Sequence, residues 1–143
     1  MKIRDVMTYP ALSIDTEATI ETAAKVMQQH NIGSLPIVSA QSGLQGIVTD
    51  RDIVVRNVAL GSDPKSVKVK DIMTTNVATV TPETDVKAAS KLMAEQQVRR
   101  LPVVDNGTLL GFVAIGDIAV TGDFNFEASK ALTDISIGCH RKR

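Results

Sequence analysis

The sequence has few of the residues on which several classes of protein depend. It contains one cysteine, Cys139, which excludes an internal disulfide framework, and it has no tryptophan, one tyrosine and three phenylalanines. Apolar runs such as residues 53–55 are far shorter than the roughly eighteen residues that a membrane span requires. The first residues lack the apolar core of a secretion signal, so we expect a cytoplasmic protein that does not associate with a membrane.

An excess of charge of one sign is also lacking. The 16 Lys and Arg residues equal the 16 Asp and Glu residues in number, so the formal net charge is zero. No broad positive field is available for nonspecific binding to nucleic acid, and any anion site has to be local. At 143 residues the chain is long enough for one compact domain, or for two small ones that share a core.

What the sequence does contain is a duplicated unit. Three segments recur in the same order at a spacing of about 65 residues, which marks an internal repeat. The pairs are IRDVMT with VKDIMT, SLPIVS with RLPVVD, and GIVTDRDIVV with GFVAIGDIAV. We therefore divide the chain into a first repeat at residues 1–60, a linker at 61–68, a second repeat at 69–122, and a C-terminal helix and tail at 123–143.

Each repeat has the pattern of a β-α-β-β-α unit. Short alternating segments at residues 11–14 and 77–80 predict a first strand. Two β-branched runs at residues 35–38 and 45–49 predict a hairpin, as do those at 101–104 and 110–114 in the second repeat. Second short helices are expected at residues 50–59 and 116–120.

The longer helix of each repeat is amphipathic. Apolar or small residues recur at i, i+3, i+4 and i+7, which predicts one buried face. Thr19 and Asp85 are the expected N-caps. The predicted face consists of Ile20, Ala23, Ala24 and Met27 in the first repeat and of Val86, Ala89, Ser90 and Met93 in the second.

The predicted fold class is α+β. A unit of about 60 residues with such short strands buries too little of its sheet alone, so we expect the two repeats to pack face to face about a pseudo-twofold axis. The segment DFNFEASKALTDIS adds a C-terminal helix with Phe124, Ala128, Leu132 and Ile135 on one stripe. We expect this helix to dock on the repeats or on a second subunit.

Three ordered motifs, each present in both halves, make the chain resemble a tandem cystathionine β-synthase (CBS) domain pair, or Bateman module. They are the Asp-[Val/Ile]-Met-Thr leader, the Leu-Pro-[Ile/Val]-Val strand, and a Gly-apolar-apolar-[Thr/Ser]-x-x-Asp segment in which Ala114 replaces the Thr of the second copy. The resemblance spans residues 3 to about 120, and the chain is similar to small stand-alone bacterial proteins with little beyond a CBS pair.

The resemblance implies a non-catalytic regulatory module without a cofactor. Such a module binds an adenosine-containing ligand of the AMP, ADP or ATP type in the cleft between two repeats, often forms a homodimer, and here would act on a separate effector protein that the sequence does not identify. The alternative is a dimeric scaffold or interaction protein of the same fold that binds no nucleotide.

The aspartates at the start of the second short helices are the first candidate ligand contacts. A carboxylate accepts charge-assisted hydrogen bonds from neighbouring ribose hydroxyls, and a helix start favours phosphate. Asp52 and Asp117 fit this role, and Thr49 can donate to a phosphate oxygen. The alternative is a capping box, which the motif does not separate from ligand binding. Because Ala114 cannot cap and Asp117 is present nevertheless, we interpret the aspartate as having a role beyond the cap.

The resemblance also implies two unequal clefts. In CBS pairs the Thr-x-x-Asp segment of one repeat faces the segment before Leu-Pro of the other, where a basic residue contacts phosphate. We call the better-equipped set the main cleft. The resemblance implies that adenine lies there between Ile47 and Val98, that the backbone near Asn76 and Val77 contacts its edge, and that an arginine binds the phosphate. Its predicted residues are Ile47, Thr49, Arg51, Asp52, Asn76, Val77, Val98, Arg99, Arg100 and Pro102.

Only one of the two adjacent arginines can face the main cleft, because neighbouring residues of an extended strand point to opposite sides. We choose Arg100; the alternative is that both arginines are exposed charges. The second set, the weaker cleft, lacks the threonine and the arginines, so it keeps only a ribose-type acceptor. Its predicted residues are Ile32, Gly33, Ser34, Phe112, Ala114 and Asp117.

Neither catalysis nor a metal site is predicted. The sequence has no P-loop, G-x-G-x-x-G, H-E-x-x-H or G-x-S-x-G motif. Asp50 and Asp52 lie two residues apart on a helix and therefore do not face one another. Cys139 with His140 supplies two potential ligands where zinc takes four.

Overall fold

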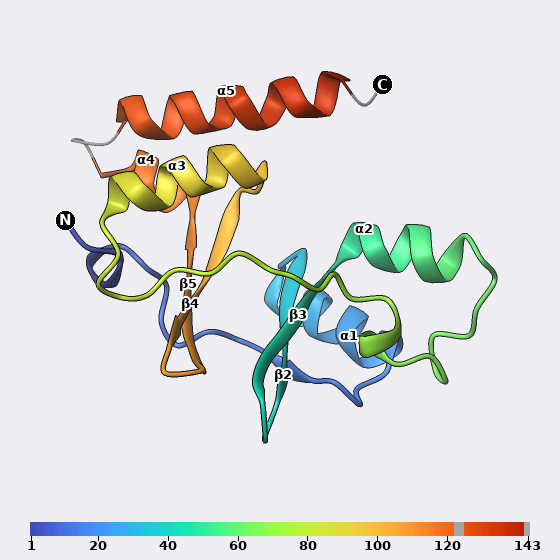
Figure 1. Ribbon diagram of the computed structural model, residues 1–143. Helices are drawn as coiled ribbons and strands as arrows, with labels where there is room; N and C mark the ends of the chain where they lie inside the picture. Colours follow the sequence, from blue (N-terminus) through green and yellow to red (C-terminus); the bar gives the residue numbers. More distant parts are fainter. Residues whose placement is uncertain (122–124, 142–143) are drawn as a thin grey trace. The chain divides into compact units, whose positions relative to one another are not determined.

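The computed structural model describes residues 1–121 and 125–141. The chain forms two compact units: Leu12–Val77, which we call the first-repeat unit, and Met1–Ala11 together with Ala78–Arg143, which we call the second-repeat unit (Figure 1). Each unit combines a small sheet with helices, so the predicted α+β class is confirmed.

The first-repeat unit contains a three-stranded sheet. Strand β2 (Ser34–Ser39) pairs antiparallel with β3 (Gly43–Thr49) and parallel with β1 (Ile14–Asp15). Its helices are α1 (Ile20–His30), α2 (Asp50–Ile53), the π-helical turn η2 (Val54–Val58) that continues α2, and the 3₁₀ turn η3 (Val69–Asp71). The core of this unit consists of Ile20, Ala23, Met27, Leu35, Ile37, Val48, Val69 and Ile72.

The second-repeat unit contains a two-stranded sheet, in which β4 (Arg100–Asp105) pairs antiparallel with β5 (Thr108–Ala114). Its helices are the 3₁₀ turn η1 (Ile3–Asp5), α3 (Val86–Gln96), α4 (Ile115–Ala119) and α5 (Asn125–Arg141). The core consists of Ile3, Val80, Val86, Ala89, Met93, Leu101, Val103, Val113, Ile118 and Ala128.

The predicted hairpins are present, but the predicted first strands are wrong in extent. Strand β1 begins at Ile14, and in the second repeat only Val80 forms a bridge, with Val103. Ala11, which we placed in the first strand, donates its backbone N–H to the carbonyl of Leu110 at 3.0 Å instead. The start of the segment is therefore paired with the hairpin of the second repeat.

The helix caps and buried faces follow the predictions with one exception. The Thr22 N–H donates to Thr19 Oγ1 at 3.2 Å, and the Lys87 N–H donates to Asp85 Oδ1 at 2.9 Å, so both N-caps are confirmed. All four residues of the predicted α3 face are buried, whereas Ala24 of α1 is exposed and its counterpart Ser90 is not. Ser90 is accommodated because its hydroxyl donates to the Lys87 carbonyl at 2.9 Å.

The leader of each repeat packs on the hairpin of the other repeat. Thr8 and Phe112 exchange two backbone hydrogen bonds, of 2.7 and 3.0 Å, and Thr74 and Ile47 exchange two of 2.8 and 3.0 Å. A Cβ on Gly111 would lie 2.3 Å from the Thr8 carbonyl oxygen, which is too close for any residue other than glycine. The same holds at Gly46, where the Thr74 oxygen would lie 2.6 Å from a Cβ. Glycine is therefore required at this position of each hairpin because the backbone of a leader crosses directly over it.

Helix α5 packs against α3 and α4 (Figure 1). Its buried residues are Ala128, Ala131 and Ile135, so the predicted stripe is right at two positions and wrong at Leu132, which is 42% exposed. The small Ala131 side chain takes the contact instead. Phe124 lies outside the described residues. No helix in the described part of the chain is long and apolar enough to cross a bilayer.

Candidate functional site

Thr49 and Asp52 form a reciprocal cap at the start of α2. The Thr49 N–H donates to Asp52 Oδ2 at 2.9 Å, and the Asp52 N–H donates to Thr49 Oγ1 at 3.0 Å. The second oxygen of Asp52, Oδ1, lies 3.9 Å from Nε of Arg56, one helical turn further on. The Asp52 side chain is 13% exposed. The capping interpretation is therefore correct for the first repeat. The cap uses one of the two Asp52 carboxylate oxygens.

Asp117 occupies the same position at the start of α4. The Ala114 N–H donates to Asp117 Oδ2 at 2.8 Å, although Ala114 has no side chain with which to complete the cap. Asp117 therefore contributes to the cap without a threonine at position 114, and a further role for this aspartate stays a prediction. The carboxylate accepts from the backbone N–H of the N-cap residue whatever side chain that residue carries.

The residues before Leu-Pro lie beside the helix start within each unit. The Asp50 N–H donates to the Gly33 carbonyl at 2.9 Å, and the Ile115 N–H donates to the Arg99 carbonyl at 2.8 Å. A Cβ on Gly33 would lie 2.9 Å from an Asp50 carboxylate oxygen. Sequence reasoning missed this acidic neighbour, which disfavours an anion at Gly33 in the weaker cleft.

The arginines of the main cleft are exposed. Arg100 pairs with Ala114 at the end of the hairpin, and Arg99 precedes it on the same edge. Arg51, on the first turn of α2, is exposed as well. None of these three guanidinium groups forms an ion pair with an acid in residues 1–121 or 125–141. Their charges are therefore not neutralised within the part of the chain that the structure describes.

The remaining predicted residues are strand and loop positions. Ile47, Val77, Val98, Ile32 and Phe112 are half-buried. Asn76 is exposed and has φ of 56°, a left-handed conformation that asparagine tolerates better than most residues. Pro102 is buried and pairs with Phe112 across the hairpin, and Ser34 pairs with Thr49.

Each predicted cleft takes residues from both compact units. In the main cleft, Ile47, Thr49, Arg51, Asp52, Asn76 and Val77 belong to the first-repeat unit, and Val98, Arg99, Arg100 and Pro102 to the second. In the weaker cleft, Ile32, Gly33 and Ser34 belong to the first-repeat unit, and Phe112, Ala114 and Asp117 to the second. That the two groups of each set meet on one ligand stays a prediction.

Comparison with known proteins accounts for this duplicated arrangement. The model of the CBS domain family matches residues 3–57 and again residues 69–120. The chain belongs to the CBS domain family. It is 42% identical over 134 residues to the CBS domain-containing protein YhcV of Bacillus subtilis, and the match covers 94% of each chain.

Two solved structures resemble this CBS chain over most of its length. Hypoxic Response Protein I with two coordinated zinc ions has a TM-score of 0.78 at 33% identity, covering 85% of this chain and 98% of that one. The CBS domain pair of protein MJ0100, in complex with methylthioadenosine and S-adenosyl-L-methionine, has a TM-score of 0.72 at 31% identity, covering 84% and 94%. The resemblance predicted from the motifs is therefore confirmed.

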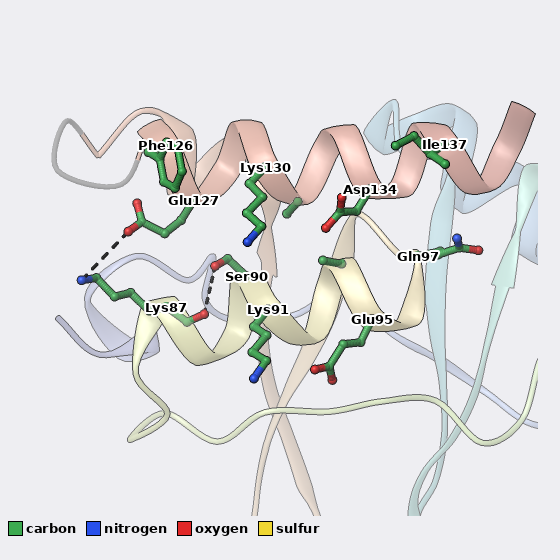
Figure 2. A pocket seen from close by; sticks show the side chains of 12 residues that line it. Lys87, Ser90, Lys91, Glu95, Gln97, Phe126, Glu127, Lys130, Asp134 and Ile137 are labelled. Atoms are coloured by element: carbon green, nitrogen blue, oxygen red, sulfur yellow. Dashed lines mark hydrogen bonds and ion pairs between the residues drawn. The ribbon is translucent and has the colours of Figure 1, made fainter.

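A groove lies outside the CBS motifs, between α3 and α5 of the second-repeat unit (Figure 2). It has a volume of about 650 Å³ and contains none of the predicted site residues. Lys87 Nζ lies 4.0 Å from Glu127 Oε1, and Figure 2 shows Lys130 and Asp134 extending from α5 toward α3. Three lysines face three acids here, Lys87, Lys91 and Lys130 with Glu95, Glu127 and Asp134. This balance of charge gives the groove no preference for an anionic ligand.

Metal ligands do not gather in the described part of the CBS chain. No three His, Cys, Asp or Glu side chains lie close enough together there to hold an ion. The side chains of Cys139 and His140 lie outside the described residues.

Proposed function

We propose that the chain is a non-catalytic regulatory module that binds an adenosine-containing ligand through the residues of the main cleft. The observation that carries the proposal is the state of the Asp52 carboxylate. One oxygen completes the helix cap, and the other, Oδ1, has Arg56 Nε at 3.9 Å as its only polar side-chain partner among the described residues. A carboxylate offers about four lone-pair sites. Capping and ribose binding are therefore compatible at this residue.

The Thr49 hydroxyl supports the same role. It accepts from the Asp52 N–H at 3.0 Å, and no acceptor for its own proton is found among the described residues. A hydroxyl carries one donor besides its lone pairs, so Thr49 can cap the helix and donate to a phosphate oxygen at the same time. Ala114 has neither capacity, which limits the weaker cleft to ligands without phosphate or to none.

Charge also favours the main cleft. Arg99 and Arg100 are exposed and unpaired with acids in the described chain, whereas the matching Gly33 lies against the Asp50 carboxylate. A phosphate is attracted to the first environment and repelled by the second. The ligand class agrees with that of the CBS pair of protein MJ0100, whose two ligands both contain adenosine.

The proposed output is a change passed to a homodimer partner or to a separate effector protein. Ligand binding would act by favouring one arrangement of the module over another, as any ligand with differential affinity does.

A thermal-shift panel with AMP, ADP, ATP, methylthioadenosine and S-adenosylmethionine tests the proposal. A ligand at about a hundred times its dissociation constant stabilises a protein by roughly 2.7 kcal/mol, which raises the melting temperature of a chain of this size by about 5 to 10 °C. The variant is Asp52→Asn, which keeps an acceptor for the Thr49 N–H and loses the charge. The matched control is Asp117→Asn, which makes the same change in the weaker cleft.

We expect Asp52→Asn to remove most of the shift and Asp117→Asn to retain it. Equal losses from the two variants would contradict a single phosphate-competent cleft. The second candidate function is a scaffold that binds no nucleotide, and it is favoured if no compound in the panel shifts the melting temperature of the wild-type chain.

A further inference from the structure

The side chain of Arg56 connects Asp52 with the leader of the second repeat, residues 69–74, which we call the second leader. One Nη of Arg56 donates to the Ile72 carbonyl at 3.0 Å, and Nε lies 3.9 Å from Asp52 Oδ1. Ile72 is 16 positions beyond Arg56 in the sequence, so helical spacing does not bring the two together. A single guanidinium thus lies between the predicted ribose acceptor and the second leader.

The Ile72 carbonyl, and not the Asp52 carboxylate, holds the guanidinium. A separation of 3.0 Å is a hydrogen bond, whereas 3.9 Å is too long for one and allows only attraction between the charges. A closer pair would occupy Oδ1, the oxygen that the helix cap does not use. Arg56 therefore places a positive charge beside the half-capped carboxylate and leaves Oδ1 able to accept from a hydroxyl.

The second leader also positions the predicted adenine contacts of the first-repeat unit. Thr74 exchanges two backbone hydrogen bonds with Ile47, which is expected to flank adenine. Asn76 and Val77, whose backbone is expected to contact the adenine edge, follow shortly after Thr74. Ile72 itself is buried, so its carbonyl is a fixed point for the guanidinium. All of these residues belong to the same compact unit, Leu12–Val77.

The second repeat has a threonine at the position that matches Arg56. This residue is Thr121, and its hydroxyl donates to the Asp117 carbonyl at 3.2 Å, within its own helical turn. A threonine side chain is too short to extend from a helix to a leader as an arginine does. The arginine is therefore found in the repeat that supplies Thr49 and Asp52, and not in the repeat that supplies Asp117.

Holding two groups of contacts in place before binding increases affinity. Association costs the ordering of side chains and segments that move in the free protein, and a site fixed in advance avoids part of that cost. Arg56 contacts Asp52 on one side and the second leader on the other. The gain is largest for a ligand that uses both, which is a ligand with adenine and an intact ribose.

We propose that Arg56 is a positioning residue for the adenosine part of the ligand, because it holds Asp52 and the second leader in one geometry. This inference rests on the proposed function and deepens it, since Arg56 acts through Asp52 and the leader. It also specifies the ligand class: an adenosine compound with a free 2′-hydroxyl is favoured over its 2′-deoxy analogue.

Isothermal titration calorimetry of the intact chain with AMP and with 2′-deoxy-AMP tests the proposal. The variant Arg56→Met keeps an unbranched side chain and loses the guanidinium. We expect the dissociation constant of AMP to rise about tenfold. That of 2′-deoxy-AMP should rise less, because a displaced Asp52 gains less from the second hydroxyl. A general loss of structure would weaken both ligands equally.

A conservative variant and a control accompany Arg56→Met. Arg56→Lys keeps the charge but lacks the planar fork that reaches two partners, so we expect an intermediate loss of AMP affinity. The matched control is Lys25→Met, which removes the cation of another i, i+4 pair in the same unit, with Glu21 at 3.1 Å. It should change neither dissociation constant.

Hydrogen exchange provides a measurement without ligand. The Thr74 N–H, which donates to the Ile47 carbonyl at 2.8 Å, should exchange faster in Arg56→Met than in the wild type. Unchanged exchange at Thr74 would overturn the connection to the second leader. Circular dichroism identifies a variant that fails to fold, and if Arg56→Met does so, the same comparisons are made with Arg56→Lys.

The outcomes separate this inference from the proposed function. A larger loss for AMP than for 2′-deoxy-AMP, with Lys25→Met like the wild type, supports the positioning role. Equal losses for the two ligands, or unchanged affinities in both Arg56 variants, would overturn that role while AMP binding by the wild type upholds the proposed function. Absence of AMP binding by the wild-type chain would contradict the proposed function for AMP, and this inference with it.

Discussion

Thr8 and Phe112, which are 104 positions apart in the sequence, exchange two backbone hydrogen bonds of 2.7 and 3.0 Å. The same exchange joins Thr74 to Ile47. Each leader therefore acts as an extra strand segment on the hairpin of the other repeat. Each compact unit therefore contains residues from both sequence repeats: the leader of one and the hairpin of the other.

The glycine under the crossing leader is the first test of this arrangement. Gly111→Ala places a Cβ 2.3 Å from the Thr8 carbonyl oxygen, so we expect a loss of about 1 to 3 kcal/mol in the free energy of unfolding, measured by urea denaturation. Gly116→Ala is the control: nothing lies within 4 Å of its Cβ, and alanine in α4 is expected to stabilise by about 0.5 to 1 kcal/mol. Equal effects at the two positions would contradict the crossing.

The missing half of the α4 cap can be restored. Ala114 has φ of −108° and ψ of 157°, close to the −112° and 163° of the capping Thr49, so a hydroxyl at position 114 would face the Asp117 N–H. We expect Ala114→Thr to raise the free energy of unfolding by about 1 kcal/mol and Thr49→Ala to lower it by about the same amount. Thr49→Ser should be close to neutral. If Ala114→Thr gives no gain in thermal denaturation, the two caps are not equivalent.

Glu17 makes the stability of the first-repeat unit depend on acid pH. Hydrogen bonds from Lys68 and then Lys70 lower the pKa of the Glu17 carboxyl from 4.5 to about 2. Because the folded pKa lies below the unfolded one, the contribution is complete above pH 4.5 and is lost as the pH falls toward 2.

Glu17→Gln should therefore lower the melting temperature slightly above pH 4.5, and its difference from wild type should disappear as the pH falls toward 2. The effect is small because the Glu17 side chain is 53% exposed. Melting temperatures across the pH range, at low and high salt, provide the measurement. An acid-unfolding curve for Glu17→Gln that coincides with wild type at low salt would show that the pairs contribute nothing.

The arginines before Leu101 test whether a phosphate is part of the ligand. Arg99→Gln and Arg100→Gln should leave the melting temperature without ligand unchanged, because both side chains are exposed and make no ion pair in the described chain. With AMP, Arg100→Gln should lose more of the thermal shift than Arg99→Gln. With methylthioadenosine, which has no phosphate, neither should lose it.

Lys130→Gln is the control for a general effect of removing one positive charge. An equal loss with both ligands would mean that the arginines act on the adenosine part or on folding rather than on phosphate.

Several features were predictable because they depend on neighbours in the sequence. The caps at Thr19 and Asp85, the hairpins and the buried faces of α1 and α3 involve residues within a few positions of one another, where spacing alone defines the geometry. The exceptions are instructive. Ala24 and Ser90 occupy equivalent positions, yet only Ser90 is buried, and on α5 the contact falls on Ala131 rather than Leu132. Helical periodicity predicts which side of a helix is buried. The elements that pack against the helix determine which residues on that side lose their exposure.

In the candidate site, too, contacts between residues close in sequence were predictable and contacts between distant residues were not. The cap formed by Thr49 and Asp52 was foreseen as one of two alternatives, because the two residues are three positions apart. The Asp50 carboxylate beside Gly33 was not foreseen, since strand and helix meet there only after folding. The half-cap at Asp117 was not foreseen, because its partner is the backbone N–H of Ala114, which every residue except proline has.

The amino-acid order thus specified a duplicated α+β chain of the CBS family, its helices and turns, and the positions of its candidate ligand contacts, all of which follow from local periodicity and repeated motifs. Only the tertiary structure determined that each leader pairs with the hairpin of the other repeat and that α5 packs on α3 and α4. The two hairpins have the same antiparallel pairing and offer each leader equivalent backbone hydrogen bonds, so only chain connectivity and long-range packing select between them.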